Sequence, residues 1–281
     1  MKPANRDAPL VAKQPLHGAY ILLTFRHPEV AQQARAGQFV MIKAGTSSEP
    51  PLRRPFSILD VDPAAGTFGL FLKTVGAGSR ALADMRPGEV AQCLGPLGVP
   101  FTPPAADREA LMVAGGYGIA PFHLFSRELR NAGRGARVFY GGRTEGDLQI
   151  RDAFDALGVP LVAATDDGSL GHRGRVTEPL EAHLDAHGDA FQIYACGPDA
   201  MLHAVARVAD RRGVPAQVSL DPWMGCGVGT CLGCVVRMQS ADDTRPHYRC
   251  ACTEGPVFDA REVVWAGDTE SVARRAVGAT A

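Results

Sequence analysis

Seven cysteines are the residues of this chain whose spacing is most distinctive. They occupy positions 93, 196, 226, 231, 234, 250 and 252, so five of them fall within 27 residues near the carboxyl end. An odd number and this crowding argue against a disulfide framework and favour a metal site. Thiolate sulfur is a soft ligand that selects iron–sulfur clusters or zinc.

The spacing within the crowded segment favours an iron–sulfur cluster. Cys226, Cys231 and Cys234 follow a C-x4-C-x2-C pattern with a later cysteine, which is typical of plant-type [2Fe–2S] ferredoxins. A four-cysteine zinc site is the alternative, but it usually shows two C-x2-C pairs, and the interleaved glycines suit a backbone that wraps closely. Cys250 and Cys252 would share a face of a strand, so spacing leaves the fourth ligand open between them.

Two short motifs in the first hundred residues have the residue types of a flavin site. Arg54-Pro55-Phe56-Ser57 offers a fork of donors for a phosphate, a hydroxyl for the flavin edge and a ring to cover it. Lys73-Thr74-Val75-Gly76-Ala77-Gly78-Ser79 leaves a strand and enters a helix, whose first N–H groups suit a pyrophosphate. An ordinary surface arginine is the alternative for the first motif alone, and the two together favour a flavin.

Two further motifs end predicted parallel strands. Gly115-Gly116-Tyr117-Gly118-Ile119-Ala120-Pro121 stands where a dinucleotide pyrophosphate binds in doubly wound folds, although Pro121 departs from the standard fingerprint. Cys196-Gly197-Pro198 places a thiol at the carboxyl edge of the sheet, where ligands bind; a buried core thiol is the alternative. Gly142-Arg143-Thr144-Glu145 carries both charge signs, so it does not decide between NAD and NADP.

The predicted secondary structure that positions these motifs changes along the chain, from strands alone to alternating strands and helices. Short alternating runs with one short helical patch (79–85) predict an antiparallel barrel, with strands at 19–25, 38–43, 55–60, 67–75 and 89–94. After a linker (103–107), alternating strands and helices predict a parallel sheet, with strands at 110–114, 136–140, 160–164 and 190–195, and helices at 121–130, 151–157, 178–186 and 198–212. The remainder, from about residue 217, is expected to be loop-like. The predicted domains are 1–104, 105–216 and 217–281.

Composition and charge exclude several classes of function. The 281 residues suit about two domains with room for a small third. A net charge of −1 without a basic block makes duplex nucleic acid a poor partner, and no run of ~18 apolar residues predicts a membrane span. The first residues lead into no apolar signal segment, so we expect the cytoplasm, where thiols stay reduced.

In their order along the chain, these motifs resemble the ferredoxin–NADP reductase-like superfamily. Residues 224–236 and 252–259 are similar to the cluster loop of the dihydroorotate dehydrogenase B electron transfer subunit family, and the resemblance covers about residues 15–265. It implies a multi-domain β and α/β fold: an N-terminal antiparallel FAD-binding β-barrel, a doubly wound parallel-sheet nicotinamide domain and a small C-terminal [2Fe–2S] domain.

The resemblance also implies the site residues. FAD would bind Arg54, Pro55, Phe56, Ser57, Lys73, Thr74, Val75, Gly78 and Ser79, and NAD(H) would lie near Gly116, Gly118, Cys196, Gly197 and Pro198. In the family the last cluster ligand is the cysteine just before x-x-Gly-Pro-Val-Phe, so the cluster would be held by Cys226, Cys231, Cys234 and Cys252, with Cys250 spare. No general acid or base is assigned.

The function that follows from the resemblance is electron relay. NADH gives two electrons as a hydride and a cluster accepts one at a time, so FAD, which does both, must lie between them. The implied partner is the FMN-carrying catalytic subunit of dihydroorotate dehydrogenase, in a heterotetramer for pyrimidine biosynthesis. The alternatives are an input subunit for a sulfite reductase, a hydrogenase or a ferredoxin:NADP transhydrogenase and, in a different class, a zinc-stabilised interaction module.

Overall fold

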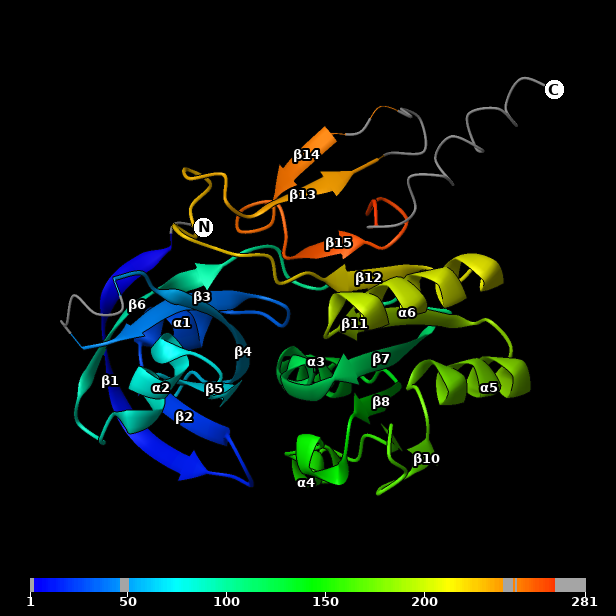
Figure 1. The fold of residues 1–281 in the computed structure, drawn as a ribbon, viewed down its shortest axis with the longest axis horizontal. Helices are drawn as coiled ribbons and strands as arrows, with labels where there is room; N and C mark the ends of the chain where they lie inside the picture. The colour runs from blue at the N-terminus through cyan, green and yellow to red at the C-terminus, as the bar shows by residue number, and fades with distance from the viewer. Residues whose placement is uncertain (1–2, 46–50, 240–244, 246, 266–281) are drawn as a thin grey trace.

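The protein consists of a barrel, a helix-covered sheet and a cysteine-containing segment that lies across both (Figure 1). The computed structural model describes residues 3–45, 51–239, 245 and 247–265. The two predicted architectures, an antiparallel barrel followed by a parallel sheet, are confirmed.

Six antiparallel strands close the barrel. Their order is β1 (Ala4–Pro15), β2 (Tyr20–Arg26), β5 (Thr67–Lys73), β4 (Arg54–Asp62), β3 (Phe39–Ala44) and β6 (Val90–Leu97). Strand β1 makes the closure, because residues 4–9 pair with β6 while residues 10–15 pair with β2, with an irregularity between Leu10 and Ala12. Two short helices, α1 (Pro28–Gln33) and α2 (Ala77–Asp84), complete this part.

Two elements of the barrel depart from the sequence prediction. No strand was expected before residue 19, yet β1 is there; it buries only Ala8 and Leu10, so its apolar pattern is weak. The expectation of a single helical patch was also wrong. Helix α1 has only six residues, begins at Pro28 and is capped by the His27 ring, which accepts the Val30 N–H at 3.4 Å.

The second part is a seven-stranded sheet in the order β10-β9-β8-β7-β11-β12-β15. Its strands are β7 (Glu109–Gly115), β8 (Ala136–Gly142), β9 (Leu161–Thr165), β10 (His172–Arg173), β11 (Phe191–Cys196), β12 (Ala216–Ser219) and β15 (Val257–Asp259). All pairs are parallel except β12 with β15. The chain moves outward from β7 to β10 and then crosses to β11, so the strand order reverses between β7 and β11. Ligands of doubly wound folds bind at this switch point.

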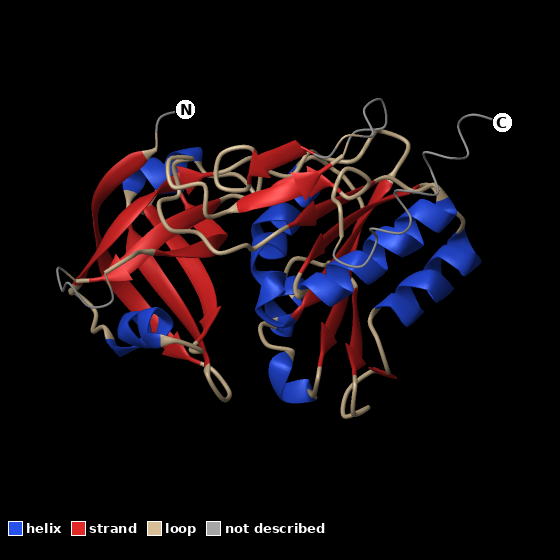
Figure 2. Cartoon of the chain, turned by 45° about the horizontal axis from the view of Figure 1, so that its top comes forward, coloured by secondary structure: helices blue, strands red, loops and turns tan. Residues whose placement is uncertain are grey.

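Helices cover both faces of the sheet (Figure 2). Met112 of β7 belongs to the same core as Phe122 of α3 (Ala120–Asn131), whereas Leu111 shares a core with Leu180 of α5 (Thr177–His187) and Leu202 of α6 (Asp199–Arg212). Helix α4 (Arg151–Asp155) and the short turns η1 (Gly116–Ile119) and η2 (Glu145–Asp147) complete this part. No helix among the described residues is long and apolar enough to cross a membrane.

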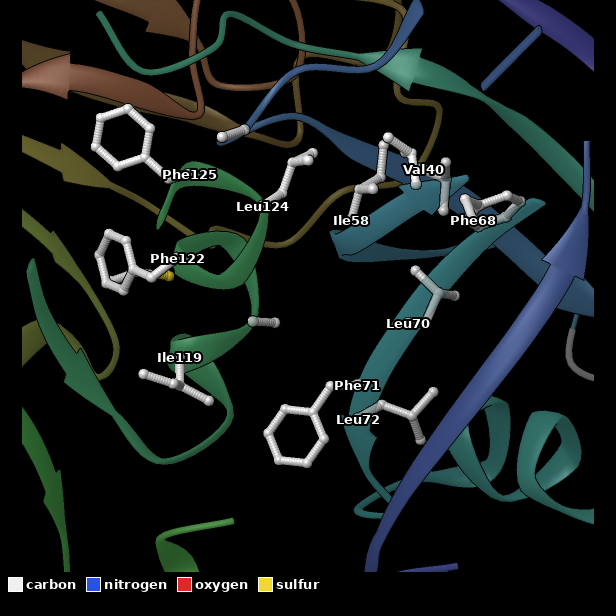
Figure 3. Close-up of a cluster of buried hydrophobic side chains, with 14 of the residues drawn as sticks. Val40, Ile58, Phe68, Leu70, Phe71, Leu72, Ile119, Phe122, Leu124 and Phe125 are labelled. Carbon is white, nitrogen blue, oxygen red and sulfur yellow. The ribbon is translucent and has the colours of Figure 1, made fainter. Parts of the chain in front are cut away.

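Helix α3 also forms the main contact between the sheet and the barrel. In Figure 3, Leu124 points toward Ile58 of β4, while Phe122 and Phe125 point away from the barrel. Arg127 forms an ion pair with Asp60 at 2.8 Å and donates to the Val61 carbonyl at 2.8 Å. The helix that starts at the predicted dinucleotide turn is therefore held against the predicted flavin-binding strands.

The cysteine-containing segment leaves the sheet after β12 and returns to it at β15. Between them, β13 (Val235–Met238) and β14 (His247–Cys250) form an antiparallel pair. The segment also contacts the barrel, because the Val99 N–H donates to the Gly255 carbonyl at 2.6 Å. The expectation that the chain is loop-like from about residue 217 was wrong in this respect, since strands of three or four residues are too short to show a periodic pattern.

Candidate functional site: a cleft shared by three parts

A cleft of about 1430 Å³ lies where the three parts of the molecule meet. Its walls come from β4, β5 and α2 of the barrel, from the carboxyl ends of β7, β8 and β11, and from the loop after β12. The predicted cofactor residues that line it are Arg54, Pro55, Phe56, Ser57, Lys73, Val75, Gly78, Ser79, Gly116, Gly118, Cys196, Gly197 and Pro198. Thr74 is the exception, and its hydroxyl donates to the Ala19 carbonyl at 3.1 Å.

The two flavin motifs meet at the amino end of α2. The Arg54 side chain lies against Gly78, where an added Cβ would stand 2.9 Å from Arg54 Cγ. Among the described residues, Arg54 Nη1 donates to the neighbouring carbonyls of Leu52 and Arg53, both at 3.3 Å. Within the described part of the chain its guanidinium has no carboxylate partner, and beside a helix N-terminus it suits a phosphate.

Ser79 has a structural task at the same helix start. Its hydroxyl accepts the N–H groups of Val75 and Gly76, each at 3.0 Å, and donates to the Gly76 carbonyl at 3.0 Å. These bonds hold the turn that leads from β5 into α2. Ser79 therefore shapes the predicted pyrophosphate cradle with its side chain, while the absence of a Cβ on Gly78 leaves room for the Arg54 side chain.

Lys73 lies at the centre of a polar cluster that joins the barrel to the sheet domain. Its Nζ is 2.8 Å from Asp147 Oδ1 and 3.2 Å from the Tyr20 hydroxyl, which itself donates to Asp147 Oδ1 at 2.8 Å. Arg143 donates two further hydrogen bonds to Asp147 Oδ2, from its backbone N–H at 3.3 Å and from its Nε at 3.0 Å. We call Tyr20, Lys73, Arg143 and Asp147 the Asp147 cluster.

The charges of the Asp147 cluster stabilise one another. Burial alone would raise the pKa of Asp147, but the hydrogen bonds from Arg143, Lys73 and Tyr20 outweigh burial and hold this pKa well below its usual range. The bond to Asp147 raises the pKa of Lys73 in return. Asp147 is therefore a permanent anion between two cations, one from each wall of the cleft.

Close backbone packing marks the switch point between β7 and β11. A Cβ on Gly118 would stand 2.3 Å from the Cys196 carbonyl oxygen, and one on Gly115 would stand 2.7 Å from Pro198 Cδ. Gly197 has a φ of +158°. The glycines let the turn after β7 touch the end of β11 directly, so the two predicted nicotinamide motifs form one surface.

We expect Gly118→Ala to destabilise the protein and weaken NADH binding, because the new Cβ collides with backbone that cannot rotate away. Overpacking of this kind costs roughly 1–3 kcal/mol. Thermal unfolding and an NADH titration measure the two effects. Gly76→Ala is the matched control for stability, since its Cβ meets nothing within 4 Å and its φ is −139°. An unchanged melting temperature and NADH affinity in Gly118→Ala would contradict the close contact.

The thiol of Cys196 is unreactive in its surroundings. Burial raises its pKa to about 12, and the side chain faces the neighbouring Ser219, with which it pairs across β11 and β12. Asp221, also in the cleft wall, has its pKa raised to about 6 by burial and by the negative charge of Asp199. The Cys196 thiol is therefore neutral at pH 7, whereas Asp221, with a pKa of about 6, is mostly ionised there and gives this end of the cleft a negative charge beside Asp199.

The cysteines of the third part gather beside the cleft, and Cys231 lines it. Burial alone would raise the pKa of Cys226, but the N–H groups of Cys231 and Val228, which point at its sulfur at 3.5 and 3.4 Å, lower the pKa to about 6. The Gly229 N–H points at the sulfur of Cys252 at 3.2 Å. Backbone donors aimed at sulfur fit thiolates that hold a metal cluster.

Two further observations bear on the fit of a cluster. Gly227 and Gly229 have φ values of +76° and +77°, and a Cβ on Gly227 would stand 2.6 Å from Met41 Cγ of the barrel, so the loop is pressed against β3. Among the described residues, no three His, Cys, Asp or Glu side chains stand in an arrangement ready for a metal ion. Ligation by Cys226, Cys231, Cys234 and Cys252 thus stays a prediction, supported by the sulfur-directed donors.

Several cleft residues were missed by the sequence analysis. Tyr20, Asp147, Asp221 and Trp223 all line the cleft. Asp147 lies four residues after Arg143 and carried a usable signal, because an acid at that spacing can pair with the arginine. Tyr20 could not be found, since an aromatic residue at the start of a strand is ordinary core material, and its partner lies 127 residues away.

Comparison with known proteins assigns a class to each part. Family models match the oxidoreductase FAD-binding domain over residues 7–101, the oxidoreductase NAD-binding domain over residues 112–207, and the iron-sulfur cluster binding domain of dihydroorotate dehydrogenase B over residues 221–264. The fold and the cleft thus define an oxidoreductase with FAD-binding, NAD-binding and iron–sulfur-binding domains.

Similar proteins over nearly the full length identify the family within this class of oxidoreductases. The electron transfer subunits of dihydroorotate dehydrogenase B (NAD(+)) from Desulforamulus reducens and Geobacillus kaustophilus are 37% and 38% identical to this chain. Each alignment covers 86% of this chain, and it covers 92% and 91% of the respective relatives. The chain belongs to the family of dihydroorotate dehydrogenase B electron transfer subunits.

Solved structures show the same fold. A chain described in work on flavin-based electron bifurcation by the NADH-dependent reduced ferredoxin-NADP oxidoreductase superposes with a TM-score of 0.81 at 29% identity, covering 96% of this chain and 93% of that one. A ferredoxin NADP+ reductase from Neisseria gonorrhoeae with bound FAD and NADP superposes with a TM-score of 0.63 at 18% identity, covering 74% and 92%. The latter likeness concerns the fold alone.

Proposed function

We propose that this chain passes electrons between NAD(H) and an FMN-carrying dihydroorotate dehydrogenase catalytic subunit, through FAD and a [2Fe–2S] cluster. The observation that carries the proposal is the shared cleft. Arg54 and Gly78 of the flavin motifs, Gly116 and Gly118 of the nicotinamide motif, and Cys231 of the cysteine loop all line it. When bound, FAD supplies the exchange between hydride chemistry and single-electron transfer, and the cluster carries single electrons.

The chain's own residues would position these groups. Arg54 and the amino end of α2 would bind the FAD pyrophosphate, while Phe56 and Ser57 would hold the flavin ring system. Gly116, Gly118 and the Cys196–Pro198 segment would receive the nicotinamide nucleotide, with neutral Cys196 at the ring. Cys226, Cys231, Cys234 and Cys252 would hold the cluster, and we propose Cys250 as the spare cysteine. Residues 1–104, 105–216 and 217–281 remain our proposed domains.

Reconstitution with the partner tests the proposal. The chain is co-expressed with a dihydroorotate dehydrogenase catalytic subunit of the FMN-dependent class, and NADH-linked reduction of orotate is measured with and without this chain. We expect the NADH-linked rate to depend on this chain and a cytoplasmic heterotetramer of two catalytic and two relay subunits to form. A rate that is the same without this chain would refute the assignment.

A second candidate partner is favoured by the structural comparison at a TM-score of 0.81. In this alternative the chain feeds electrons into a ferredoxin-dependent NADP oxidoreductase instead. The matching iron–sulfur model, which is that of dihydroorotate dehydrogenase B, favours the first candidate. NADH-linked reduction of ferredoxin by a complex isolated from the source cells, together with no orotate reduction, would favour the alternative. The oxidoreductase domains leave a redox-inactive zinc module without support.

A further inference from the structure

A second, smaller pocket lies at the opposite edge of the sheet from the cofactor cleft. It has a volume of about 290 Å³ and sits at the amino ends of β7 and β8. Its walls are the start of β7, the end of α3, the turn into β8 and the turn before β9, and the residues that line it are Glu109, Ser126, Arg130, Arg134, Gly135, Ala136, Arg137, Leu157, Gly158, Val159 and Pro160.

Three arginines give this pocket its charge. Arg130 and Arg137 form no ion pair with any described residue, and Glu109, the one acid in the wall, pairs with neither of them. Arg134 Nη2 donates to the backbone carbonyls of Pro104, at 2.6 Å, and Ala105. These bonds fix the side chain in place, but carbonyls are neutral and leave its positive charge uncompensated. The wall thus carries three positive charges and one negative charge, in a chain whose net charge is −1.

A buried hydroxyl adds a donor to the same wall. Ser126 is 1% exposed, and within the described ranges its Oγ has the sulfur of Met112, at 3.8 Å, as its partner. A thioether is a weak acceptor, so this hydroxyl is poorly satisfied for a group removed from solvent. An oxyanion in the pocket would accept from Ser126 as well as from the arginines.

From these features we propose that the pocket binds a small phosphate monoester. Its surplus of two positive charges matches the charge of about −1.5 to −2 on a phosphate monoester near pH 7, whereas a carboxylate needs only one bidentate arginine. The volume equals that of roughly ten waters at ~30 Å³ each, which limits the ligand to a small metabolite. Glu109 would accept from a hydroxyl or amino group of the ligand.

The pocket is placed so that its ligand can be sensed elsewhere in the molecule. Strand β7 runs from Glu109 in the pocket to Gly115 at the cofactor cleft, and β8 runs from Arg137 to Gly142 beside Arg143. Arg134 holds the carbonyls of Pro104 and Ala105, in the connection between the barrel and the sheet. A bound phosphate would therefore lie at the starts of β7 and β8 and beside Arg134, the residue that holds the interdomain connection.

Isothermal titration of the cofactor-loaded protein with glycerol 3-phosphate tests the proposal, with NAD+ in excess to fill phosphate positions in the cleft. We expect binding at one site per chain, no binding of glycerol, and weaker binding of succinate. Arg130→Ser/Arg137→Ser should weaken binding by about tenfold or more, the value of one charge-assisted hydrogen bond. Arg207→Ser, at an exposed position on α6, should bind like the wild type.

Several results would overturn the phosphate pocket: no binding to the wild type, unchanged binding to the double variant, loss of binding in Arg207→Ser, or binding of succinate as tight as that of glycerol 3-phosphate. The melting temperature of the unliganded double variant shows whether it is folded. If it is not, Arg137→Gln alone is used, and unchanged binding to that variant overturns the proposal equally. None of these outcomes depends on the electron acceptor of the complex.

Discussion

Cys252→Ser should remove most of the iron and acid-labile sulfide from the purified protein, whereas Cys250→Ser should leave both in place. The structure distinguishes the two thiols. Cys252 is fully buried and receives the N–H of Gly229 from the cysteine loop at 3.2 Å. Cys250 ends β14 and is only partly buried. Serine oxygen is a much harder ligand than thiolate, so replacing a ligand weakens the cluster while replacing a spare cysteine does not.

Iron and sulfide analysis and the paramagnetic signal of the reduced protein measure this effect, and Cys250→Ser is the matched control. FAD content should remain unchanged in both variants, because the predicted flavin residues belong to the barrel and α2. If Cys250→Ser lost the iron and Cys252→Ser kept it, the fourth ligand would be Cys250. A colourless wild type that contains zinc would contradict the cluster itself.

Asp147→Asn should lower the free energy of unfolding at pH 7 by about 1.5–3 kcal/mol, the value of a hydrogen bond to a charged group. Asp147 is only 8% exposed, and its carboxylate links Lys73 and Tyr20 of the barrel to the sheet domain. Asparagine keeps the shape but removes the negative charge and turns an amide NH2 group toward a cation. Urea unfolding measures the loss, and Asp155→Asn, an exposed acid on α4, is the control.

The stability difference between the wild type and Asp147→Asn should also depend on pH. Because the folded pKa of Asp147 lies below its unfolded value of ~3.9, its contribution is fully present well above that value and is lost as pH falls through the folded pKa. The difference in stability between the wild type and Asp147→Asn should therefore be constant near neutral pH and shrink below about pH 4. A difference that grows on acidification would contradict the anionic state of Asp147.

The same substitution should also change the choice of nucleotide. Arg143 follows β8, where the adenosine ribose lies in doubly wound folds, and Asp147 occupies its Nε at 3.0 Å. In Asp147→Asn this guanidinium is released and can pair with the additional phosphate of NADPH. We expect the ratio of kcat/KM for NADPH to that for NADH to rise. An unchanged ratio would show that Arg143 does not reach the ribose.

The sequence predicted those features of the site that depend only on residues close together in the chain. The Gly115–Pro121 turn could be recognised because a close backbone approach demands glycine, and Gly118 indeed lies against the Cys196 carbonyl. The cysteine spacing likewise encodes its own geometry within nine residues. Strand β7 was predicted since a central parallel strand is apolar on both faces, and its residues 110–115 are all buried.

The features that were missed depend on distant partners. Strand β1 is polar along most of its length. It pairs with β2, which follows it directly, and with β6, which lies far along the chain, so its own residues carry only a weak strand pattern. The Asp147 cluster joins residues 20, 73, 143 and 147, and no segment contains more than two of them. Strands β12 and β15 are too short to show a periodic pattern, and they form by pairing within the sheet, β12 with β11 and β15 with β12.

Strand β15 also has a consequence for solubility. As the last strand of the sheet, it occupies the hydrogen-bonding groups of β12 on the side away from β11. A chain shortened to end after Leu220 would leave those groups uncovered, and an open strand edge is a template for pairing with another copy. The cysteine-containing segment thus protects the nucleotide-binding sheet from self-association, so a two-domain fragment made for crystallisation should carry a polar substitution on β12.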